Sequence, residues 1–346
     1  MNILIVKLSA IGDVIHTLPA LSALRRHDPD AHITWVIEEA ASDLIQGHPD
    51  LDRVIISRRK RWIGNLRNRR SGGAWQEMRQ FIRELRERRY DLVIDFHGLF
   101  KSAAIVFLSG GRRKLGYDSM QELSGLFYNE KIPEDMSRHA VDRYLDFVRY
   151  LGVDAGAADF LIPVDEANRT RAEGLLSEAG IAAKGAFVAV SPQALWETKL
   201  WADENFARLC ERIALGLNRP VVFTGSDAEA VARIQALMTA PSVSLAGRTT
   251  LRDLACVYRD AALLITTDSG PMHLAAAMKT PIVALFGPTD PKRTGPYGDG
   301  HVVLRREMPC SPCFARTCDT KLCMRQITVD EVYETVRGKL AETGTG

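Results

Sequence analysis

Residues 261–288 read AALLITTDSGPMHLAAAMKTPIVALFGP, and this stretch decides the fold. Two short apolar runs, 262–267 and 281–287, flank a segment of helical spacing that begins near Pro271. Runs of this length, rich in Leu, Ile and Val, are typical of strands buried on both faces. Near-continuous apolar strands that alternate with helices predict a parallel sheet covered by helices on both sides.

The same alternation extends outward over the whole chain. In the first half we expect five strands and three helices, the strands over 3–8, 32–37, 53–57, 91–96 and 112–118 and the helices over 14–26, 40–46 and 75–89. In the second half we expect five more strands and four helices, the strands over 186–192, 220–225, 242–247, 262–267 and 281–287 and the helices over 202–215, 228–238, 251–259 and 271–278. Each half therefore has its own series of alternating strands and helices. This predicts an α/β protein with two doubly wound, Rossmann-like domains.

The join between the domains is expected in the Gly-, Ala- and Pro-rich segment 152–170. We therefore assign residues 1–160 to an N-terminal domain, 161–327 to a C-terminal domain and 328–346 to a final helix and tail. The final helix is expected over 329–340, and the sequence leaves open whether it crosses back onto the N-terminal domain.

Composition narrows the class of protein. A length of 346 residues is enough for two domains, and a net charge of +2 argues against a dedicated nucleic-acid binder. The apolar N-terminus is interrupted by Lys7 and Asp13 and lacks a small-residue cleavage site, which argues against a signal peptide. No run approaches the roughly 20 apolar residues that span a bilayer. We expect a soluble, cytoplasmic protein.

Polar residues follow several of the expected strands. Ligands of open parallel sheets bind beyond the carboxyl ends of the strands, and two facing sheets would bring their ends to one central cleft. After the first strand come Ser9, Gly12 and Asp13. Asp13 at a helix start is interpreted either as a helix cap, favoured by the free backbone N–H groups, or as a general base.

In the second half, hydroxyl and glycine residues follow three strands, in the segments 224–226, 266–270 and 287–289. Helix N-termini at such positions suit a phosphate, while the absence of GxGxxG and Walker motifs argues against NAD and against P-loop hydrolysis. A nucleotide-sugar fits this pattern. Asp268 would repel phosphate and is expected to face sugar hydroxyls or a cation. His273 lies one helical turn after Ser269; a lone histidine would be interpreted as packing, but beside Asp268 we favour a binding role.

Six quoted segments together resemble one enzyme family: KLSAIGDVIHTLPAL, YDLVIDFHGLFKSA, LFYNEKI, RHAVDRY, ETKLW and TTDSGPMHLAAAMKTPIVALFGPTDP. In this order, from Met1 to about Asp330, the chain resembles the ADP-heptose–lipopolysaccharide heptosyltransferases, which are inverting glycosyltransferases of the GT-B fold. Within the family it is most similar to heptosyltransferase I. The resemblance implies transfer of heptose from ADP-L-glycero-D-manno-heptose to the Kdo of lipid A-linked inner core in lipopolysaccharide biosynthesis.

The resemblance also implies roles for individual residues. Asp13 would be the catalytic base, and Lys199 would hold the donor diphosphate. The other donor-binding residues implied are Thr224, Gly225, Glu229, Thr267, Asp268, Ser269, Gly270 and His273, with Glu229 at the ribose. Gly12, Lys101 and His139 fall on the acceptor side. No cofactor is required if Lys199 stabilises the leaving diphosphate. One departure precedes Lys199, because Leu195 and Trp196 stand where relatives often carry small hydroxyl or basic residues.

A basic run lies between the third and fourth expected strands. It contains Trp62, no acidic residue and seven cations: Arg58, Arg59, Lys60, Arg61, Arg67, Arg69 and Arg70. Such a run is usually a solvated loop, and no motif supports nucleic-acid binding. A Kdo–lipid A acceptor carries carboxylates and phosphates at the inner leaflet, so we expect the loop over 58–70 to bind it and to make peripheral contact with the cytoplasmic face of the inner membrane.

Four cysteines, Cys310, Cys313, Cys318 and Cys323, form a C-x2-C-x4-C-x4-C pattern. A structural zinc site, an iron–sulfur cluster and reduced thiols in a loop are all compatible with this spacing, and we favour reduced thiols. The other two cysteines, Cys210 and Cys256, lie in helical patterns and are expected in the core.

Two rival functions stay open at this point. One is a heptosyltransferase II or another GT-B transferase with a different acceptor or nucleotide-sugar. The other is a non-catalytic nucleotide-sugar-binding protein, against which the joint presence of Asp13, Lys199 and Asp268 argues. Acceptor-dependent turnover discriminates among the three.

Overall fold

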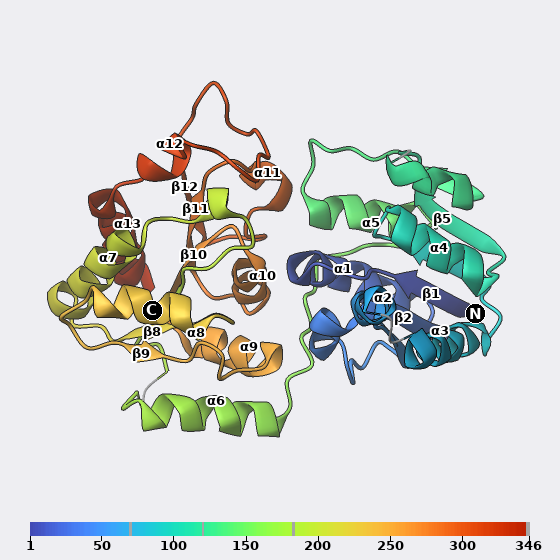
Figure 1. The fold of residues 1–346 in the computed structure, drawn as a ribbon, viewed down its shortest axis with the longest axis horizontal. Helices are drawn as coiled ribbons and strands as arrows, with labels where there is room; N and C mark the ends of the chain where they lie inside the picture. The colour runs from blue at the N-terminus through green and yellow to red at the C-terminus, as the bar shows by residue number, and fades with distance from the viewer. Residues whose placement is uncertain (69–70, 120, 182–183, 344–346) are drawn as a thin grey trace. The chain divides into compact units, whose positions relative to one another are not determined.

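A computed structural model describes residues 1–68, 71–119, 121–181 and 184–343 (Figure 1). The chain divides into two compact units, Met1–Pro163 and Val164–Gly346, each built on one six-stranded parallel sheet. The expected pair of doubly wound α/β units is therefore confirmed. None of the helices in the described ranges combines the length and the apolar character that crossing a bilayer requires.

The first unit carries its sheet in the order β3-β2-β1-β4-β5-β6. Its strands are β1 (Asn2–Val6), β2 (His32–Glu38), β3 (Arg53–Ser57), β4 (Leu92–Asp95), β5 (Arg113–Tyr117) and β6 (Glu130–Ile132). The central strand β1 pairs with β2 on one side and β4 on the other, so that Val6 lies between Val36 and Asp95. The strand order reverses here, and a crevice opens at such a switch point beyond the strand ends.

Helices cover both faces of this sheet. They are α1 (Ile11–His27), η1 (Glu39–Leu44), α2 (Arg59–Arg67), α3 (Ser71–Arg86), α4 (Phe100–Ser109), η2 (Gln121–Phe127) and α5 (Ala140–Tyr150). Alternation along β1 turns Leu4 and Val6 toward the core that holds Phe81 of α3 and Ala103 of α4. On the other face α1 packs against α5.

The second unit repeats the plan with the order β12-β11-β10-β7-β8-β9. Its strands are β7 (Val188–Ser191), β8 (Val221–Phe223), β9 (Val243–Ser244), β10 (Leu263–Thr267), β11 (Ile282–Phe286) and β12 (Val302–Arg305). All pairs are parallel, and β10 and β11 are buried along their whole lengths. The switch point lies between β7 and β10, which are neighbours in the sheet but not in the chain.

The helices of the second unit complete its layers. They are α6 (Glu166–Glu178), η3 (Glu197–Lys199), α7 (Asp203–Gly216), α8 (Ala228–Ala236), α9 (Leu251–Asp260), α10 (Gly270–Ala277), α11 (Pro291–Thr294), α12 (Leu322–Arg325) and α13 (Val329–Thr343). One core joins Val190 and Ile265 of the sheet to Phe206 of α7 and to Val332 and Val336 of α13. The final helix thus packs on the second unit, next to α7.

Three local expectations need correction. The helix expected over 40–46 is a 3₁₀ helix, Glu39–Leu44. The edge strands β6 and β12 were not anticipated, because three or four residues without a sustained apolar run give little signal. The basic run expected as a loop is helical over Arg59–Arg67. Arginine and lysine are good helix formers, and Trp62 anchors this helix in the core.

Candidate functional site

Asp13 lies at the switch point of the first sheet. Helix α1 begins at Ile11, three residues earlier than expected, so Asp13 occupies its first turn and Gly12 is buried beside it. The carboxylate accepts a hydrogen bond from the backbone N–H of Ala10 at 3.2 Å. Asp13 therefore caps the helix, which is one of its two interpretations. Its side chain is also partly exposed, so it remains available as a general base.

A buried lysine and tyrosine stand behind Asp13. Lys7 Nζ donates to the Phe96 carbonyl at 3.0 Å and to the Tyr144 hydroxyl at 2.6 Å. Tyr144 in turn donates to Asp13 Oδ1 at 3.3 Å. Burial lowers the pKa of Lys7, against the opposing effect of the Asp13 and Asp95 carboxylates. Burial and the neighbouring Asp13 carboxylate raise the pKa of Tyr144, so its hydroxyl stays protonated and holds Asp13 in place.

His97 follows β4 and belongs to the same group. Its backbone N–H donates to Asp95 Oδ1 at 2.8 Å, which fixes the turn after the strand. Burial, reinforced by the positive charges of Lys7 and Lys101, lowers the pKa of His97 to about 3. The imidazole is therefore neutral at physiological pH and can exchange one hydrogen bond as donor and another as acceptor.

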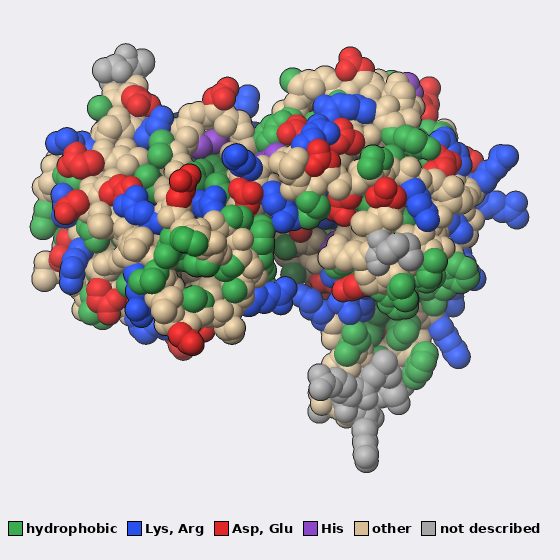
Figure 2. All heavy atoms as spheres, turned by 90° about the horizontal axis from the view of Figure 1, so that it is seen from above, with side chains coloured by type: hydrophobic (Ala, Val, Ile, Leu, Met, Phe, Trp, Pro, Cys, Tyr) green, Lys and Arg blue, Asp and Glu red, His purple; other side chains and the backbone are tan. Residues whose placement is uncertain are grey.

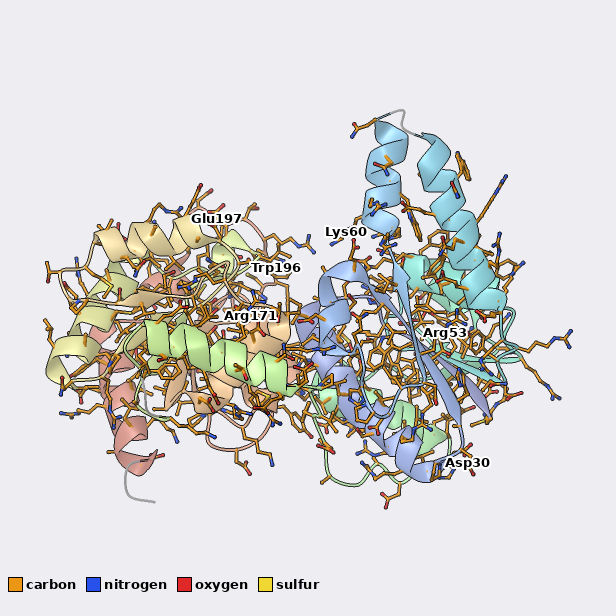
Figure 3. The ribbon with its side chains drawn as sticks, turned by 90° about the horizontal axis from the view of Figure 1, so that it is seen from below. Asp30, Arg53, Lys60, Arg171, Trp196 and Glu197 are labelled. Carbon is orange, nitrogen blue, oxygen red and sulfur yellow. The ribbon has the colours of Figure 1, made fainter. Side chains whose placement is uncertain are left out.

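Glu38 gathers the cations of the basic run. Its side chain is 5% exposed at the end of β2 and lies 3.4 Å from Arg59, 3.6 Å from Lys60 and 3.7 Å from Lys101. One buried carboxylate thus holds the N-terminal turns of α2 and α4, and three positive charges around one negative charge leave an excess suited to an anion. Figure 3 shows Lys60 where the α2–α3 hairpin leaves the sheet.

The other cations of the run differ in their surroundings. Arg58 pairs with exposed Glu39 at 3.1 Å, and Arg61 pairs with Glu77 of α3. The acidic partners of these two arginines therefore come from η1 and α3, outside the basic run. Trp62 does not face solvent as an aromatic contact for a ligand, because it is 7% exposed and packs on Phe81. Of the remaining predicted cations, Arg69 and Arg70 and the side chain of Arg67 lie outside the described residues.

The remaining acceptor-side residues lie at two helix starts. Lys101, in the first turn of α4, also approaches the Ser9 hydroxyl at 3.4 Å. Burial lowers its pKa, against the effect of Glu38. His139 caps α5 by accepting a hydrogen bond from the backbone N–H of Val141 at 3.2 Å, and its ring packs edge-on against His16.

The second unit brings Lys199 and Asp268 together. Their side chains, 15% and 6% exposed, meet at 2.7 Å, and Asp268 also accepts from Thr289 Oγ1 at 2.6 Å. Lys199 Nζ lies 4.4 Å from the ring centre of Trp196. The tryptophan that departs from the family pattern thus serves as a platform for this ammonium group. An ammonium has three N–H donors, so a phosphate oxygen can be bound while Asp268 holds one of them.

Gln193 ties the strand ends around this pair. Its side-chain oxygen accepts from the backbone N–H groups of Ser226 and Asp227 at 3.0 and 3.2 Å, and its carbonyl accepts from Thr267 at 3.1 Å. Gly225 has a φ of +144°, and a Cβ there would lie 2.5 Å from the Gln193 amide. A glycine is needed at this close approach.

The other predicted donor-binding residues are placed as follows. Ser269 precedes α10, with Gly270 and a proline in the first turn as expected, and His273 is buried on this helix. Glu229 is exposed in the first turn of α8. Thr224 is fully buried, and its hydroxyl is engaged by Tyr258 at 2.9 Å. The role of Thr224 in donor binding stays a prediction.

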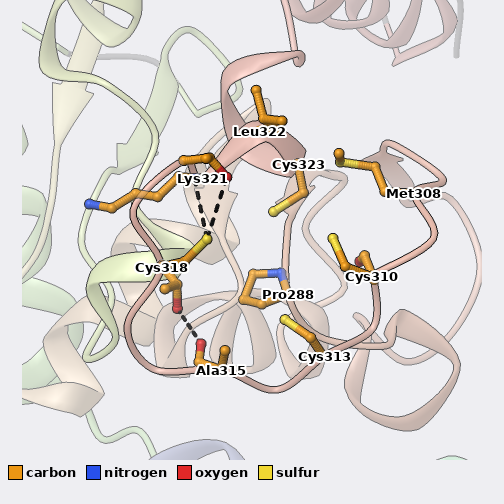
Figure 4. Close-up of a pocket in the computed structure, with 12 residues that line it drawn as sticks. Pro288, Met308, Cys310, Cys313, Ala315, Cys318, Lys321, Leu322 and Cys323 are labelled. Carbon is orange, nitrogen blue, oxygen red and sulfur yellow. Dashed lines mark hydrogen bonds between the residues drawn. The ribbon is translucent and has the colours of Figure 1, made fainter.

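The four tail cysteines line one pocket next to η3 (Figure 4). All are free thiols, and within the described residues no three His, Cys, Asp or Glu side chains are grouped so as to hold a metal ion. The loop instead supports the lysine, because Thr198 donates to the Ala315 carbonyl at 2.7 Å and Lys321 pairs with Glu197. Cys210 and Cys256 are buried in helices, as expected.

Cys318 is expected to be the first thiol alkylated. It accepts a hydrogen bond from the backbone N–H of Lys321 at 3.4 Å, and this bond, with those from Thr320, lowers the pKa of the exposed thiol. A larger thiolate fraction at pH 7.5 speeds its reaction. Brief iodoacetamide treatment followed by peptide mass spectrometry measures this order. Cys210, whose pKa burial raises, should react last, and faster labelling of Cys210 than of Cys318 would contradict the assignment.

The site residues that the sequence did not single out are Lys7, Glu38, His97, Tyr144 and Gln193. Two of them carry a signal in hindsight. Lys7 interrupts an apolar run at its end, and Gln193 directly follows a buried strand. Glu38 and Tyr144 carry none, because their partners lie from 21 to 137 residues away along the chain and only the fold brings them together.

Comparisons with known proteins show which family the chain belongs to. Residues 78–324 match the model of glycosyltransferase family 9 (heptosyltransferase). The chain is 34% identical over 327 residues to a lipopolysaccharide heptosyltransferase 1 of Pseudomonas aeruginosa, covering 92% of this chain and 87% of the relative. The fold is similar to Escherichia coli heptosyltransferase WaaC with ADP (TM-score 0.80, 27% identity, 98% and 100% covered). It is also similar to WaaC with ADP-2-deoxy-2-fluoro heptose (TM-score 0.78, 28% identity, 98% and 99% covered), so the expected GT-B fold is shown.

Proposed function

Because the chain belongs to glycosyltransferase family 9, the heptosyltransferases, we propose that it transfers heptose from ADP-L-glycero-D-manno-heptose to the Kdo of lipid A-linked inner core. The protein is a glycosyltransferase. The observation that carries the proposed substrates is the match, over 92% of the chain, to a lipopolysaccharide heptosyltransferase 1. The solved relative with an ADP-heptose analogue supports the donor.

The second unit is proposed to bind the donor. Lys199, aligned by Asp268 and Trp196, would contact the diphosphate together with the backbone N–H groups at the start of α10. Ser269, Gly270 and His273 would complete the pocket, and Glu229 would contact the ribose. Charge that develops on the departing ADP would be stabilised by the ammonium group, so the reaction as proposed has no metal-dependent step.

The first unit is proposed to bind the acceptor. Arg59, Lys60 and Lys101, gathered on Glu38, would bind carboxylate or phosphate groups of the acceptor. Gly12 and His139 would lie beside the acceptor sugar. The Kdo hydroxyl would hydrogen-bond to Asp13, which Tyr144 holds in position.

Transfer then proceeds as a single displacement. The acceptor oxygen forms a bond to the anomeric carbon while the bond from that carbon to the diphosphate oxygen breaks, and the configuration inverts. Asp13 takes the proton of the attacking hydroxyl, and ADP leaves with the electron pair of the broken bond. A reference carboxylate with a pKa near 4 is ionised at neutral pH and can accept this proton.

A lipid-linked acceptor also implies a location. We place the enzyme at the cytoplasmic face of the inner membrane, in peripheral contact through the basic segment 58–70. The net positive surface around Arg59 and Lys60 supports this, since each basic residue near an anionic surface contributes about 1 kcal/mol.

Glu38→Gln is expected to raise the KM for the acceptor about tenfold and to leave the KM for ADP-heptose unchanged. Without the carboxylate, three cations from α2 and α4 repel one another and lose their preorganised positions, a change of about 1.4 kcal/mol in acceptor binding. Steady-state kinetics with each substrate varied in turn measures both constants. Glu39→Gln is the matched control, because this neighbouring, exposed acid pairs with Arg58 at the surface. Equal acceptor KM values for the two variants would contradict the role of Glu38.

The proposed function is tested by ADP release from ADP-heptose in three reactions: with Kdo–lipid A, with an acceptor that already carries heptose, and without an acceptor. Kdo–lipid A should support ADP release. The reaction without an acceptor should give only background release. If release requires an acceptor that already carries heptose, the chain is a heptosyltransferase II. If ADP-heptose binds but no acceptor supports release, the proposed substrates are wrong.

A further inference from the structure

The first unit exposes an aromatic and aliphatic surface on α4 and η2, which pack against each other. Four large side chains stand more than half exposed there: Phe100 at 52%, Phe107 at 60%, Leu123 at 57% and Leu126 at 68%. We call these four residues the α4–η2 patch. Figure 2 views the molecule from the side of α4 and η2, and hydrophobic side chains gather on this face of the first unit.

The patch is continuous and not a set of scattered residues. Phe100 and Phe107 stand two helical turns apart on one face of α4, and the Phe127 ring lies 6.0 Å from each of their rings. Leu126 directly precedes Phe127. Contiguous apolar surface of this kind on a soluble unit marks an interaction site, whereas single exposed apolar residues do not.

The backbone of η2 holds the patch outward. Leu123 has a φ of +62° and Glu122 a φ of +51°, a left-handed conformation that costs a residue with a side chain roughly 1 kcal/mol or more. Glu122 accepts a hydrogen bond from the backbone N–H of Phe100 at 3.2 Å, which links this turn to the start of α4. Two consecutive residues in this left-handed conformation lower the stability of the fold. Such residues are typical of functional segments.

Three cations border the patch, and one exposed acid, Glu122, lies within it. Lys101 lies at the start of α4, and Arg86 donates to the carbonyl of Leu108 at its end at 2.8 Å. Lys114 Nζ lies 5.8 Å from the ring centre of Phe107. The combination of exposed aromatic rings with a basic rim fits the interface of an anionic bilayer, where rings enter the headgroup region and cations contact phosphates.

We propose that the α4–η2 patch is the surface by which the first unit docks on an anionic lipid bilayer. This inference rests on the proposed function, because a lipid-linked acceptor must be reached at the membrane. It adds an apolar anchor to the electrostatic contact of segment 58–70. A second copy of the chain is a poorer occupant, since a twofold interface would bring the basic rims of both copies together.

The test is co-sedimentation of the full chain with vesicles of phosphatidylethanolamine and phosphatidylglycerol at physiological salt. The double variant Phe107→Ser, Leu126→Ser should partition onto these vesicles about tenfold more weakly than the wild type. The matched control is the double variant Leu215→Ser, Leu237→Ser, which replaces two exposed apolar side chains of the second unit. These side chains are 71% and 51% exposed. The control should bind the vesicles as strongly as the wild type. Thermal unfolding of all three proteins shows that the variants are folded.

Turnover with a water-soluble Kdo acceptor that lacks acyl chains should be the same for the double variant and the wild type. Equal vesicle binding by the double variant and the wild type would overturn the proposal, as would failure of the wild type to bind. A wild-type dimer that the double variant abolishes would assign the patch to a second copy and also overturn it. A third outcome is also informative: the double variant loses vesicle binding, but the wild type does not transfer heptose. This result would support the α4–η2 patch as the docking surface and reject the proposed substrates.

Discussion

Replacing Asp13 with asparagine should lower kcat for heptose transfer by about 10²- to 10⁴-fold, the range that a positioned general base contributes. Asparagine has the size of aspartate and can keep the contact with the backbone N–H of Ala10, but it cannot take the proton of the attacking hydroxyl. Acceptor-dependent ADP release measures kcat. Calorimetric titration with ADP-heptose should show unchanged donor affinity, because the proposed donor residues belong to the second unit.

The matched control for this variant is Asp142→Asn. Asp142 is also the third residue of its helix, α5, in the same unit, and it is also partly exposed. Removing its charge reproduces the loss of a favourable interaction with a helix N-terminus, which contributes about 0.3–1 kcal/mol, without removing a base. If Asp13→Asn keeps more than a tenth of wild-type kcat, Asp13 is not the base.

Lys199→Met should lower kcat/KM for ADP-heptose by about 10²- to 10³-fold, the effect of losing one preorganised group that stabilises developing charge. It should also reduce the free energy of unfolding by about 3 kcal/mol, because the Asp268 carboxylate, 6% exposed, is left without its cation. Urea unfolding and steady-state kinetics measure the two effects separately.

Two controls separate catalysis from stability. Lys199→Arg keeps the charge and should restore most of the unfolding free energy. Lys184→Met removes a lysine that is 67% exposed and pairs with Asp260. This variant should change the free energy of unfolding by less than about 1 kcal/mol. Its kcat/KM for ADP-heptose should equal that of the wild type. Wild-type kcat/KM in Lys199→Met would exclude Lys199 from the donor site.

Much of the fold was predictable because parallel strands buried on both faces leave a strong apolar signal. The expected strands 262–267 and 281–287 differ from β10 and β11 by only one residue at an end. Asp13 and Asp268 were predicted as site residues for a related reason, since Asp268 directly follows the buried strand β10 and Asp13 lies in the first turn of the helix after β1. Short edge strands such as β6 lack that signal.

The environment of the basic run could not be predicted in this way. Seven cations without a nearby acid resemble a solvated loop, but α2 is held by Trp62 in the core, and Glu38, Glu39 and Glu77 pair with four of the seven cations. These acids are brought in by β2, η1 and α3. A pairing between residues distant in the chain depends on the tertiary fold, and local sequence does not encode it.

The packing of α13 has a consequence for biosynthesis. This helix supplies Val332, Val336 and Leu340 to the core beneath β7, β10 and β11, yet it is translated after every strand of that sheet. The first unit contains all of its own strands and helices before residue 164, so it can fold on the ribosome while the rest of the chain is being made. Until translation passes α13, the nascent second unit leaves uncovered the part of its sheet that this helix covers, and we expect that apolar surface to be prone to aggregation over this interval.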